Sequence, residues 1–356
     1  SALTNTGIFQ KAKDAKQKSA NAELDQNTKL DSYEEEISNY LPQDVKQAIK
    51  KGKPLSTDKN TEIVDEKGNK IVIPAGFKVT GDATTVDKGI VIEDATVDKD
   101  GKPTATAGSQ FVWIPVGTIT KADGTETTIT LERYDFDYST GAESVYSGSY
   151  IVEEDANNPS TLKNIEGKSI AKNITNFKNS VKANGGYYIG RYEARTTTPR
   201  NDIGNDLTQI TEKGTDQVYN YVKQQQAAQL AQGMYTSNNF TSDLMNSYAW
   251  DTATLFLQNC GTNKKYSIKN SFNSSLLQTG TNALRETKKI DKQCNVYDMA
   301  SNVGEWTTET STSHSNFPCV RMGGDYNDIS DITSNRISSR TSNSNDYVGF
   351  RPLLYL

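Results

Sequence analysis

The sequence has 356 residues, enough for one large domain with insertions or for two smaller ones. It carries 39 Lys and Arg against 44 Asp and Glu, which argues against a general nucleic-acid binder with a basic surface. No apolar run reaches the roughly 18 residues that a membrane-spanning helix needs. Hydrophobic residues make up only 34% of the chain, but 18 Tyr, 10 Phe and 3 Trp can build a core. We therefore expect a folded protein with much polar loop surface.

Histidine and cysteine are scarce. The single histidine, His314, argues against a His-based catalytic triad or a His-rich metal site. Three cysteines cannot form a complete intramolecular disulfide framework. One disulfide between two of Cys260, Cys294 and Cys319 is possible, and the sequence does not indicate which two would form it.

Residues 4–50 predict a mostly helical segment, because apolar side chains recur at near-helical spacing between charged ones. Pro42 interrupts this pattern, and Gly52 followed by Pro54 ends it. The apolar positions are Ile8, Phe9, Ala12, Ala15, Leu24, Leu30, Tyr33 and Ile37.

The start of this segment, Leu-Thr-Asn-Thr-Gly-Ile-Phe-Gln-Lys-Ala at 3–12, resembles a type IV pilin-like protein just past its hydrophobic membrane segment. The resemblance implies that residues 1–52 are a stem that carries a head. It also implies that contacts with a membrane or with other pilin subunits would be made through an N-terminal anchor that is missing here. An ordinary amphipathic helix is the alternative.

Residues 60–116 read as strands and turns. Ile71 to Ile73, the turn-like Pro-Ala-Gly at 74–76 and Phe77 to Val79 suggest a hairpin. Phe111 to Val116 is an apolar strand in which Pro115 indicates a sheet edge or a bulge. A polar insertion follows at about 118–170, with short strands expected around 128–134 and 145–152. We expect helices at 168–184, 217–234 and 244–258.

Four motifs follow one another in the second half of the chain. They are Gly-Tyr-Tyr-Ile-Gly-Arg-Tyr-Glu-Ala at 186–194, Ser-Tyr-Ala-Trp-Asp-Thr-Ala at 247–253, Val-Tyr-Asp-Met-Ala-Ser-Asn-Val-Gly-Glu-Trp-Thr at 296–307, and Arg-Met-Gly-Gly-Asp-Tyr at 321–326, closed by Val-Gly-Phe-Arg at 348–351. Together they resemble the formylglycine-generating-enzyme (sulfatase-modifying factor) family over about 111–356. The resemblance implies an α+β, C-type-lectin-like head with much irregular structure over 60–356.

The family resemblance also makes Asn302 and Glu305 plausible calcium ligands, since Ca²⁺ needs several oxygen atoms. The alternative is that both residues only hydrogen-bond the turn at Val303 and Gly304. Apart from calcium, we expect no cofactor. Trp250 and Trp306 are expected in the core.

The enzymes of this family oxidise a cysteine with a cysteine pair that lies between the Gly-Gly turn and the Gly-Phe-Arg strand. Residues 325–348 contain no cysteine, and a thiolate is the metal ligand and nucleophile in such chemistry. Fold resemblance alone does not confer function. We therefore predict a protein that is not an enzyme, and an oxygenase of this family stays as the alternative.

The same segment has an unusual composition. Residues 325–347 use only Asp, Tyr, Asn, Ile, Ser, Thr and Arg, although Lys and Glu are common elsewhere in the chain. Five of these types are one base change away from an Asn codon, and Arg is two changes away. This tract resembles the variable region of a diversity-generating-retroelement protein, in which adenines of Asn codons are randomised. A polar low-complexity loop is the alternative.

We expect a ligand-binding surface within about 321–351, because side chains can vary freely only where the fold does not depend on them. Gly323, Gly324, Gly349, Phe350 and Arg351 should be scaffold, with Phe350 buried. The binding residues should be exposed on one side of the head. They are Asp325, Asn327, Asp328, Ile329, Asp331, Ile332, Asn335, Ile337, Ser338, Ser339, Arg340, Asn343, Asn345, Asp346 and Tyr347.

The sequence thus predicts a non-catalytic, adhesin-like protein on the cell surface or pilus of a prokaryote, with a diversified surface for a protein or cell-surface ligand. A receptor-binding protein of a phage particle is the alternative within the same class, because it would not need the stem.

The absent cysteine pair gives a direct test. Purified protein supplied with copper is expected not to oxidise the cysteine of a sulfatase-derived peptide, because no thiolate pair is present at the required position. Mass spectrometry of the peptide checks this. Conversion to the aldehyde would restore the oxygenase alternative.

Overall fold

The structure, a computed structural model, describes residues 14–19, 22, 47–48, 54–152, 174–202, 207–269, 291–311, 316–328 and 330–356. Two compact units make up the chain, Ser1–Gln47 and Ala48–Leu356. Residues 14–19 of the first unit are helical and exposed, and nearly all the rest of the predicted N-terminal helix lies outside the described residues. In the parts of the chain that the structure describes, no helix is long and apolar enough to cross a membrane.

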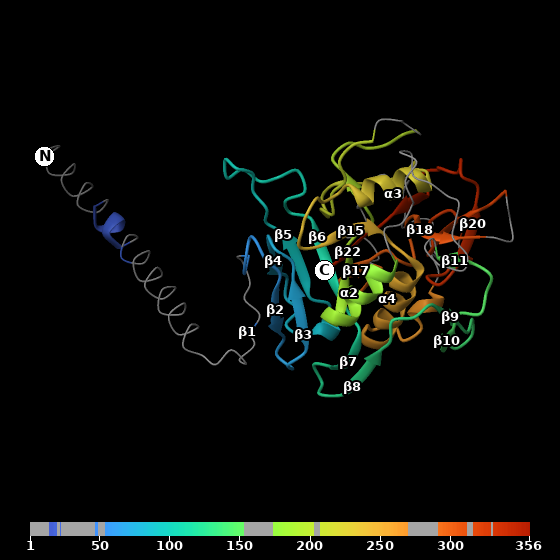
Figure 1. Ribbon diagram of the computed structural model, residues 1–356, viewed down its shortest axis with the longest axis horizontal. Helices are drawn as coiled ribbons and strands as arrows, with labels where there is room; N and C mark the ends of the chain where they lie inside the picture. Colours follow the sequence, from blue (N-terminus) through green and yellow to red (C-terminus); the bar gives the residue numbers. More distant parts are fainter. Residues whose placement is uncertain are drawn as a thin grey trace, which may run out of the picture. The chain divides into compact units, whose positions relative to one another are not determined.

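A six-stranded antiparallel sheet forms the centre of the second unit (Figure 1). Its order is β15 (Thr241–Leu244), β22 (Pro352–Tyr355), β12 (Gly186–Gly190), β6 (Gln110–Pro115), β5 (Val91–Asp94) and β4 (Phe77–Thr80). The last strand of the chain, β22, therefore lies between two strands that come much earlier in the sequence.

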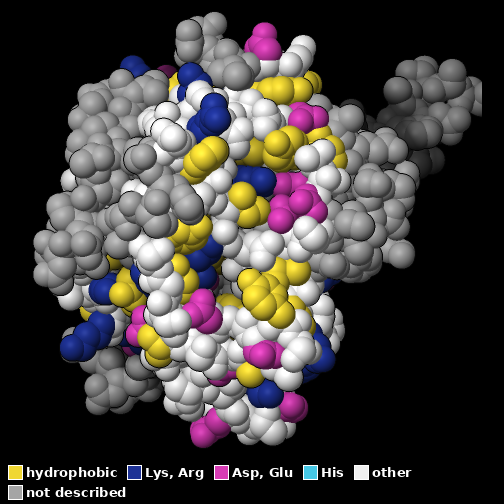
Figure 2. All heavy atoms as spheres, turned by 90° about the vertical axis from the view of Figure 1, so that its right-hand side faces the viewer, with side chains coloured by type: hydrophobic (Ala, Val, Ile, Leu, Met, Phe, Trp, Pro, Cys, Tyr) yellow, Lys and Arg dark blue, Asp and Glu magenta, His cyan; other side chains and the backbone are white. Residues whose placement is uncertain are grey.

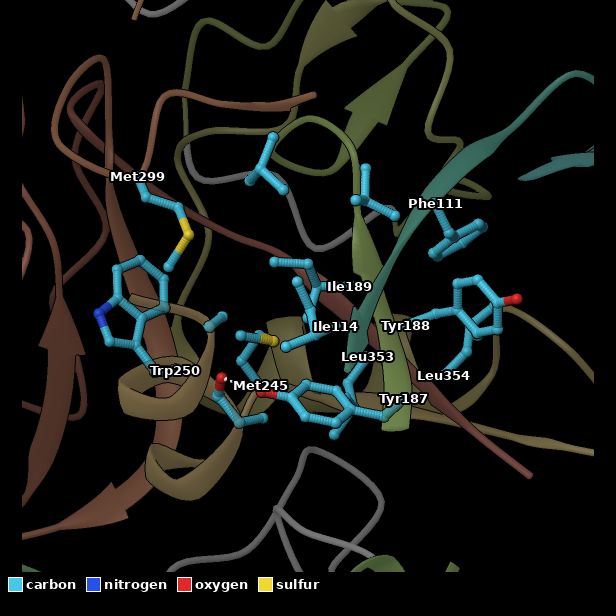
Figure 3. Close-up of a cluster of buried hydrophobic side chains, with 14 of the residues drawn as sticks. Phe111, Ile114, Tyr187, Tyr188, Ile189, Met245, Trp250, Met299, Leu353 and Leu354 are labelled. Atoms are coloured by element: carbon cyan, nitrogen blue, oxygen red, sulfur yellow. Dashed lines mark hydrogen bonds between the residues drawn. The ribbon is translucent and has the colours of Figure 1, made fainter. Parts of the chain in front are cut away.

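Side chains on both faces of this sheet are buried, which explains why β12 is aromatic and apolar throughout. Tyr187 and Tyr188 follow one another and point to opposite sides of the strand (Figure 3). The Tyr187 hydroxyl donates to the carbonyl of Ala249 in α4 (Ser247–Cys260) at 2.7 Å, and the Tyr188 hydroxyl donates to the Val72 carbonyl at 2.9 Å. Trp250 is fully buried on the α4 side, as the sequence predicted, and so is Trp306 elsewhere in the core.

A second sheet carries the C-terminal tract. Its order is β11 (Ile151–Val152), β18 (Gly304–Thr310), β19 (Cys319–Met322) and β20 (Arg336–Ser339), and β21 (Val348–Phe350) pairs with β18 in parallel. Strand β20 is contributed by the tract itself, and among the described strands it pairs with β19. The tract therefore begins after β19, forms an outer strand of the sheet and ends at β21.

The other elements are short. The paired strands are β2 (Thr61–Val64) with β3 (Lys70–Ile73), β7 (Gly117–Thr120) with β8 (Glu126–Ile129), β9 (Tyr134–Phe136) with β10 (Glu143–Val145), β13 (Arg195–Thr196) with β14 (Gln217–Val218), and β16 (Lys292–Gln293) with β17 (Val296–Tyr297). The remaining elements are β1 (Gln47–Ala48), η1 (Val86–Lys88), α2 (Ile174–Asn184), α3 (Gln224–Gln232) and η2 (Tyr266–Ile268).

The second unit is thus a mixed fold with more strands than helices, as expected. The three expected helices are present as α2, α3 and α4, although α3 is shorter than predicted. The predicted hairpin at 71–79 is wrong, because β3 pairs with β2 whereas β4 pairs with β5. The expected edge position of Pro115 is also wrong: β6 lies between β12 and β5, and the proline is tolerated because it is the last residue of the strand.

Candidate functional site

A fully buried ion pair between Arg351 and Glu305 holds the C-terminal motifs together. The guanidinium donates to both carboxylate oxygens, at 2.6 and 3.0 Å, and also to the carbonyls of Gly190 and Tyr297, each at 2.8 Å. One side chain therefore joins three of the four sequence motifs. Burial raises the pKa of Glu305 to about 7, and the positive charge of Arg351 opposes that rise.

The geometry of Asn302 and Glu305 does not fit a calcium site. Both oxygens of Glu305 already accept hydrogen bonds from Arg351, so a cation would have to displace a guanidinium. The Asn302 amide nitrogen donates to Glu193, although its carbonyl oxygen is buried without a partner. Within the described residues, no group of three or more His, Cys, Asp and Glu could hold a metal ion.

The Gly323-Gly324 turn fixes where the tract leaves the core. Gly323 has φ of +86°, and a Cβ there would lie 2.6 Å from the Met299 carbonyl oxygen. A Cβ on Gly324 would lie 2.4 Å from the Ala300 carbonyl oxygen. Side chains are excluded at both positions because the backbone of the 296–307 motif passes so close. Phe350, at the other end of the tract, is buried as predicted.

Several residues inside the tract are anchors with structural partners. Asp325 is buried, pairs with Arg321 at 2.5 Å and accepts from the backbone N–H groups of Asn327 and Asp328. Thr333 is also buried, and its carbonyl accepts a hydrogen bond from the Trp250 indole at 3.0 Å. These contacts hold the tract against α4 and the Gly-Gly turn.

Arg336 is the strongest of these anchors. It donates to Glu309 at 2.8 Å and forms a further ion pair with Asp251, and both carboxylates are buried. Arg133 adds a second guanidinium, 3.0 Å from Glu309, so two positive groups balance two negative ones. Both guanidiniums lie over the Tyr146 ring, at 4.3 and 4.1 Å from its centroid.

Fourteen of the fifteen predicted binding residues are described, and they divide into three groups by exposure. Asn327, Asp328 and Arg340 are exposed, and Asn335, Ile337, Ser338, Asn343, Asn345, Asp346 and Tyr347 are half-buried. Ile329 lies outside the described residues. The predicted exposure is wrong for Asp325, Asp331, Ile332 and Ser339, which are buried.

The four buried members have different structural roles, none of which the composition of the tract revealed. Asp325 forms an ion pair with Arg321 and accepts a hydrogen bond from the backbone of the turn that follows Asp325. Asp331 accepts from Asn335 at 3.2 Å inside the tract, and Ser339 is paired with Cys319 on β19. Ile332 is only 8% exposed, so it packs in the core, as isoleucine side chains often do.

An open groove of about 440 Å³ lies along the tract. It brings together six of the predicted residues with Arg321, Phe317, Ser342 and Ser344, which the prediction missed. The six are Ile337, Ser338, Ser339, Arg340, Asn343 and Asn345. Ser342 and Ser344 belong to the same restricted composition and could have been included. Phe317 and Arg321 precede the tract, and only the pairing of β19 with β20 brings Arg321 to the groove.

A second cluster in the tract surrounds Tyr347. Its ring contacts that of Tyr326 edge to face, with centroids 6.4 Å apart, and the Arg321 guanidinium lies 5.4 Å from its centroid. The Tyr326 hydroxyl donates to Asp346, and the Asn345 amide donates to the Tyr347 hydroxyl at 2.7 Å. These internal contacts hold the aromatic side chains in place beside the groove.

The three cysteines form no disulfide, and burial disfavours the thiolate form of each. Cys260 and Cys319 are buried, and burial raises the pKa of each thiol to about 12. Burial also raises the pKa of Cys294 well above its usual value. A reactive cysteine needs the opposite shift, toward the thiolate.

The second unit is therefore a mixed α+β domain with a groove formed largely by one C-terminal tract. No family model matches the sequence, and no curated protein matches it. Among solved structures, the chain aligns with Treponema denticola variable protein 1, with a TM-score of 0.36 and 14% identity. That alignment covers 72% of this chain and 99% of that protein.

Two arginines of the tract should respond differently to substitution. Arg336→Ser should lower the free energy of unfolding by about 3–5 kcal/mol, because it leaves buried carboxylates without a counter-charge. Arg340→Ser removes an exposed guanidinium and should change the free energy of unfolding by less than about 0.5 kcal/mol. Urea unfolding of both variants measures the difference, and equal effects would contradict the division into anchors and displayed residues.

Asp331 gives a pH-dependent test. Burial and the nearby Asp325 carboxylate raise its pKa to about 6, so its ionised form destabilises the fold increasingly as the pH rises from about 4 to 6. Asp331→Asn should therefore stabilise the protein on the order of 1 kcal/mol at pH 7.5 and hardly at all at pH 4. Thermal melts at both pH values measure this, and a gain that does not depend on pH would argue against the shift.

Proposed function

We propose that this chain is a non-catalytic ligand-binding protein whose head has a C-type-lectin-like fold and whose tract 325–347 is a diversified binding surface. The position of the tract carries this proposal. A segment built from residue types related to Asn lines an open groove, while its ends are held by the Gly-Gly turn and by β21. A rigid frame with variable side chains is the arrangement that binding loops use.

Diversification by a retroelement explains why the tract is restricted to seven residue types. The buried anchors limit which positions can vary. Arg336 and Thr333 each have partners outside the tract, so changes there would cost stability rather than alter specificity. We propose that variation is concentrated at the exposed and half-buried positions.

The chemistry of the tract suits recognition of a protein or another cell-surface ligand. Tyr offers a large contact area at low entropic cost, and small polar side chains adapt their hydrogen bonds. Figure 2 views the side on which β20 and β11 lie in Figure 1 and shows a mostly white described surface with separate hydrophobic and charged side chains. Such a mixed surface favours adaptable recognition over insertion into an apolar environment.

We further propose display on a prokaryotic cell surface or pilus through the pilin-like segment 1–52. A phage receptor-binding protein is the alternative for location. The upstream gene sequence separates them, because a short leader followed by an apolar helix would precede residue 3 in a pilin-like protein.

A library tests the proposal. Five groove positions, Ile337, Ser338, Arg340, Asn343 and Asn345, are varied among the types reachable from Asn codons, and binders to one purified protein are selected by yeast display. The variants should keep Tm within about 5 °C of the parent, since substitutions outside the core usually change the free energy of unfolding by less than about 0.5 kcal/mol each. Binding of each selected variant should be lost when its tract is restored to the parental sequence.

A matched library at the anchors Asp325, Thr333 and Arg336 should instead lose cooperative unfolding. Failure of the groove library to yield any tract-dependent binder, or a general loss of folding, would overturn the proposed function. In the neighbouring DNA, a reverse-transcriptase gene and a near-copy of the tract that differs at adenines are the expected genetic signature.

A further inference from the structure

Two arginines and no acidic residue line the groove, and one of the two, Arg321, is ion-paired with the buried Asp325. Among its ten lining residues are Arg321 and Arg340, and none of the ten is Asp or Glu. Arg340 is exposed, and it forms no ion pair with any described residue. The chain as a whole carries net charge −5, so this local excess is not a reflection of overall composition.

Two polar groups at the groove have no partner. Arg321 is 9% exposed; its Nη1 atom pairs with Asp325, but its Nε atom is buried and makes no hydrogen bond within the described structure. The Ser344 hydroxyl is likewise buried and unpaired, although its residue lines the groove. A buried donor without an acceptor costs about 1–3 kcal/mol, so an incoming acceptor would be favoured.

The position of Arg321 is tightly constrained. A Cβ on Gly304 would lie 2.4 Å from the Arg321 Nη1 atom, so the side chain passes directly over a glycine of β18. Asp325 and the Tyr347 ring hold the guanidinium from other sides. The cation is therefore pre-organised, which lowers the entropic cost of binding an anion.

Apolar surface lies beside these charges. Phe317 is 38% exposed, and the Arg340 guanidinium lies 5.3 Å from the centroid of its ring. Ile337 lines the same groove. A ligand group could therefore place an oxyanion near the arginines and an apolar portion against Phe317.

We propose that the groove of this chain binds an oxyanion, a carboxylate or a phosphate ester, carried next to an apolar group. This inference rests on the proposed function, since it names the ligand chemistry of the same surface. Arg321 precedes the tract and would be present in every tract variant, whereas Arg340 lies inside it. The constant arginine supplies a general preference for anions, and residue 340 adjusts its strength.

Calorimetry with the full-length chain tests this with three probes: acetyl-Phe-Glu amide, its neutral analogue acetyl-Phe-Gln amide, and phenyl phosphate. The better-bound anionic probe identifies whether a carboxylate or a phosphate ester is preferred. The preferred anion should bind at least about tenfold more tightly than the neutral dipeptide, as charge-assisted hydrogen bonds imply. Raising the salt from 0.05 to about 0.5 M should weaken that binding.

Arg340→Ser should weaken binding of the preferred anion by at least about tenfold. Lys99→Ser is the matched control, because it removes one exposed positive charge from a loop outside the groove and should change the affinity less than about twofold. Equal binding of the neutral and anionic probes, or equal effects of the two variants, would overturn the inference. The library above separates the two failures: tract-dependent binders together with no anion preference would leave the proposed function intact.

Discussion

The structure depends most on the buried pair of Arg351 and Glu305. Removing two charged side chains from water costs free energy unless they pair with each other and form further hydrogen bonds. Here the guanidinium reaches the carboxylate of Glu305 and the backbone carbonyls of Tyr297 and Gly190, so it joins the end of the chain to the 296–307 motif and to β12. Segments separated by more than 150 residues are thereby held in one arrangement, as the spacing between Gly190 and Arg351 illustrates. Removal of either partner would leave a buried charge unbalanced.

That scaffold allows the tract to combine two roles. Its ends are fixed where the Gly-Gly turn passes the 296–307 motif and where β21 pairs with β18. Between these points Arg336 enters a neutral cluster of buried charges, and Arg340, four residues later, is exposed at the groove. The same residue type therefore stabilises the fold at one position and is available to a ligand at the other. Burial and available counter-charges, rather than composition, make the difference.

The groove is formed by two segments that are held in the fold in different ways. Arg321 lies on β19 between Gly304 and Asp325, and its position is set by the sheet. Ile337, Arg340 and Asn343 come from the tract itself. Under the proposed function, Arg321 would stay constant while the tract residues vary. This combination can preserve one general chemical preference while its detailed specificity changes.

The sequence by itself determined the mixed fold class, the main helices, the buried tryptophans, the Gly-Gly turn and the segment that lines the groove. These features depend on local periodicity, on glycine's lack of a side chain and on the unusual composition of residues 325–347. Only the tertiary structure decided that β4 pairs with β5, that Asp325 and Ile332 are buried, and that Phe317 and Arg321 join the groove. Each of these outcomes depends on contacts between residues in separate elements. Local sequence patterns cannot specify such contacts, because the same residue type is stable in the core with a partner and on the surface without one.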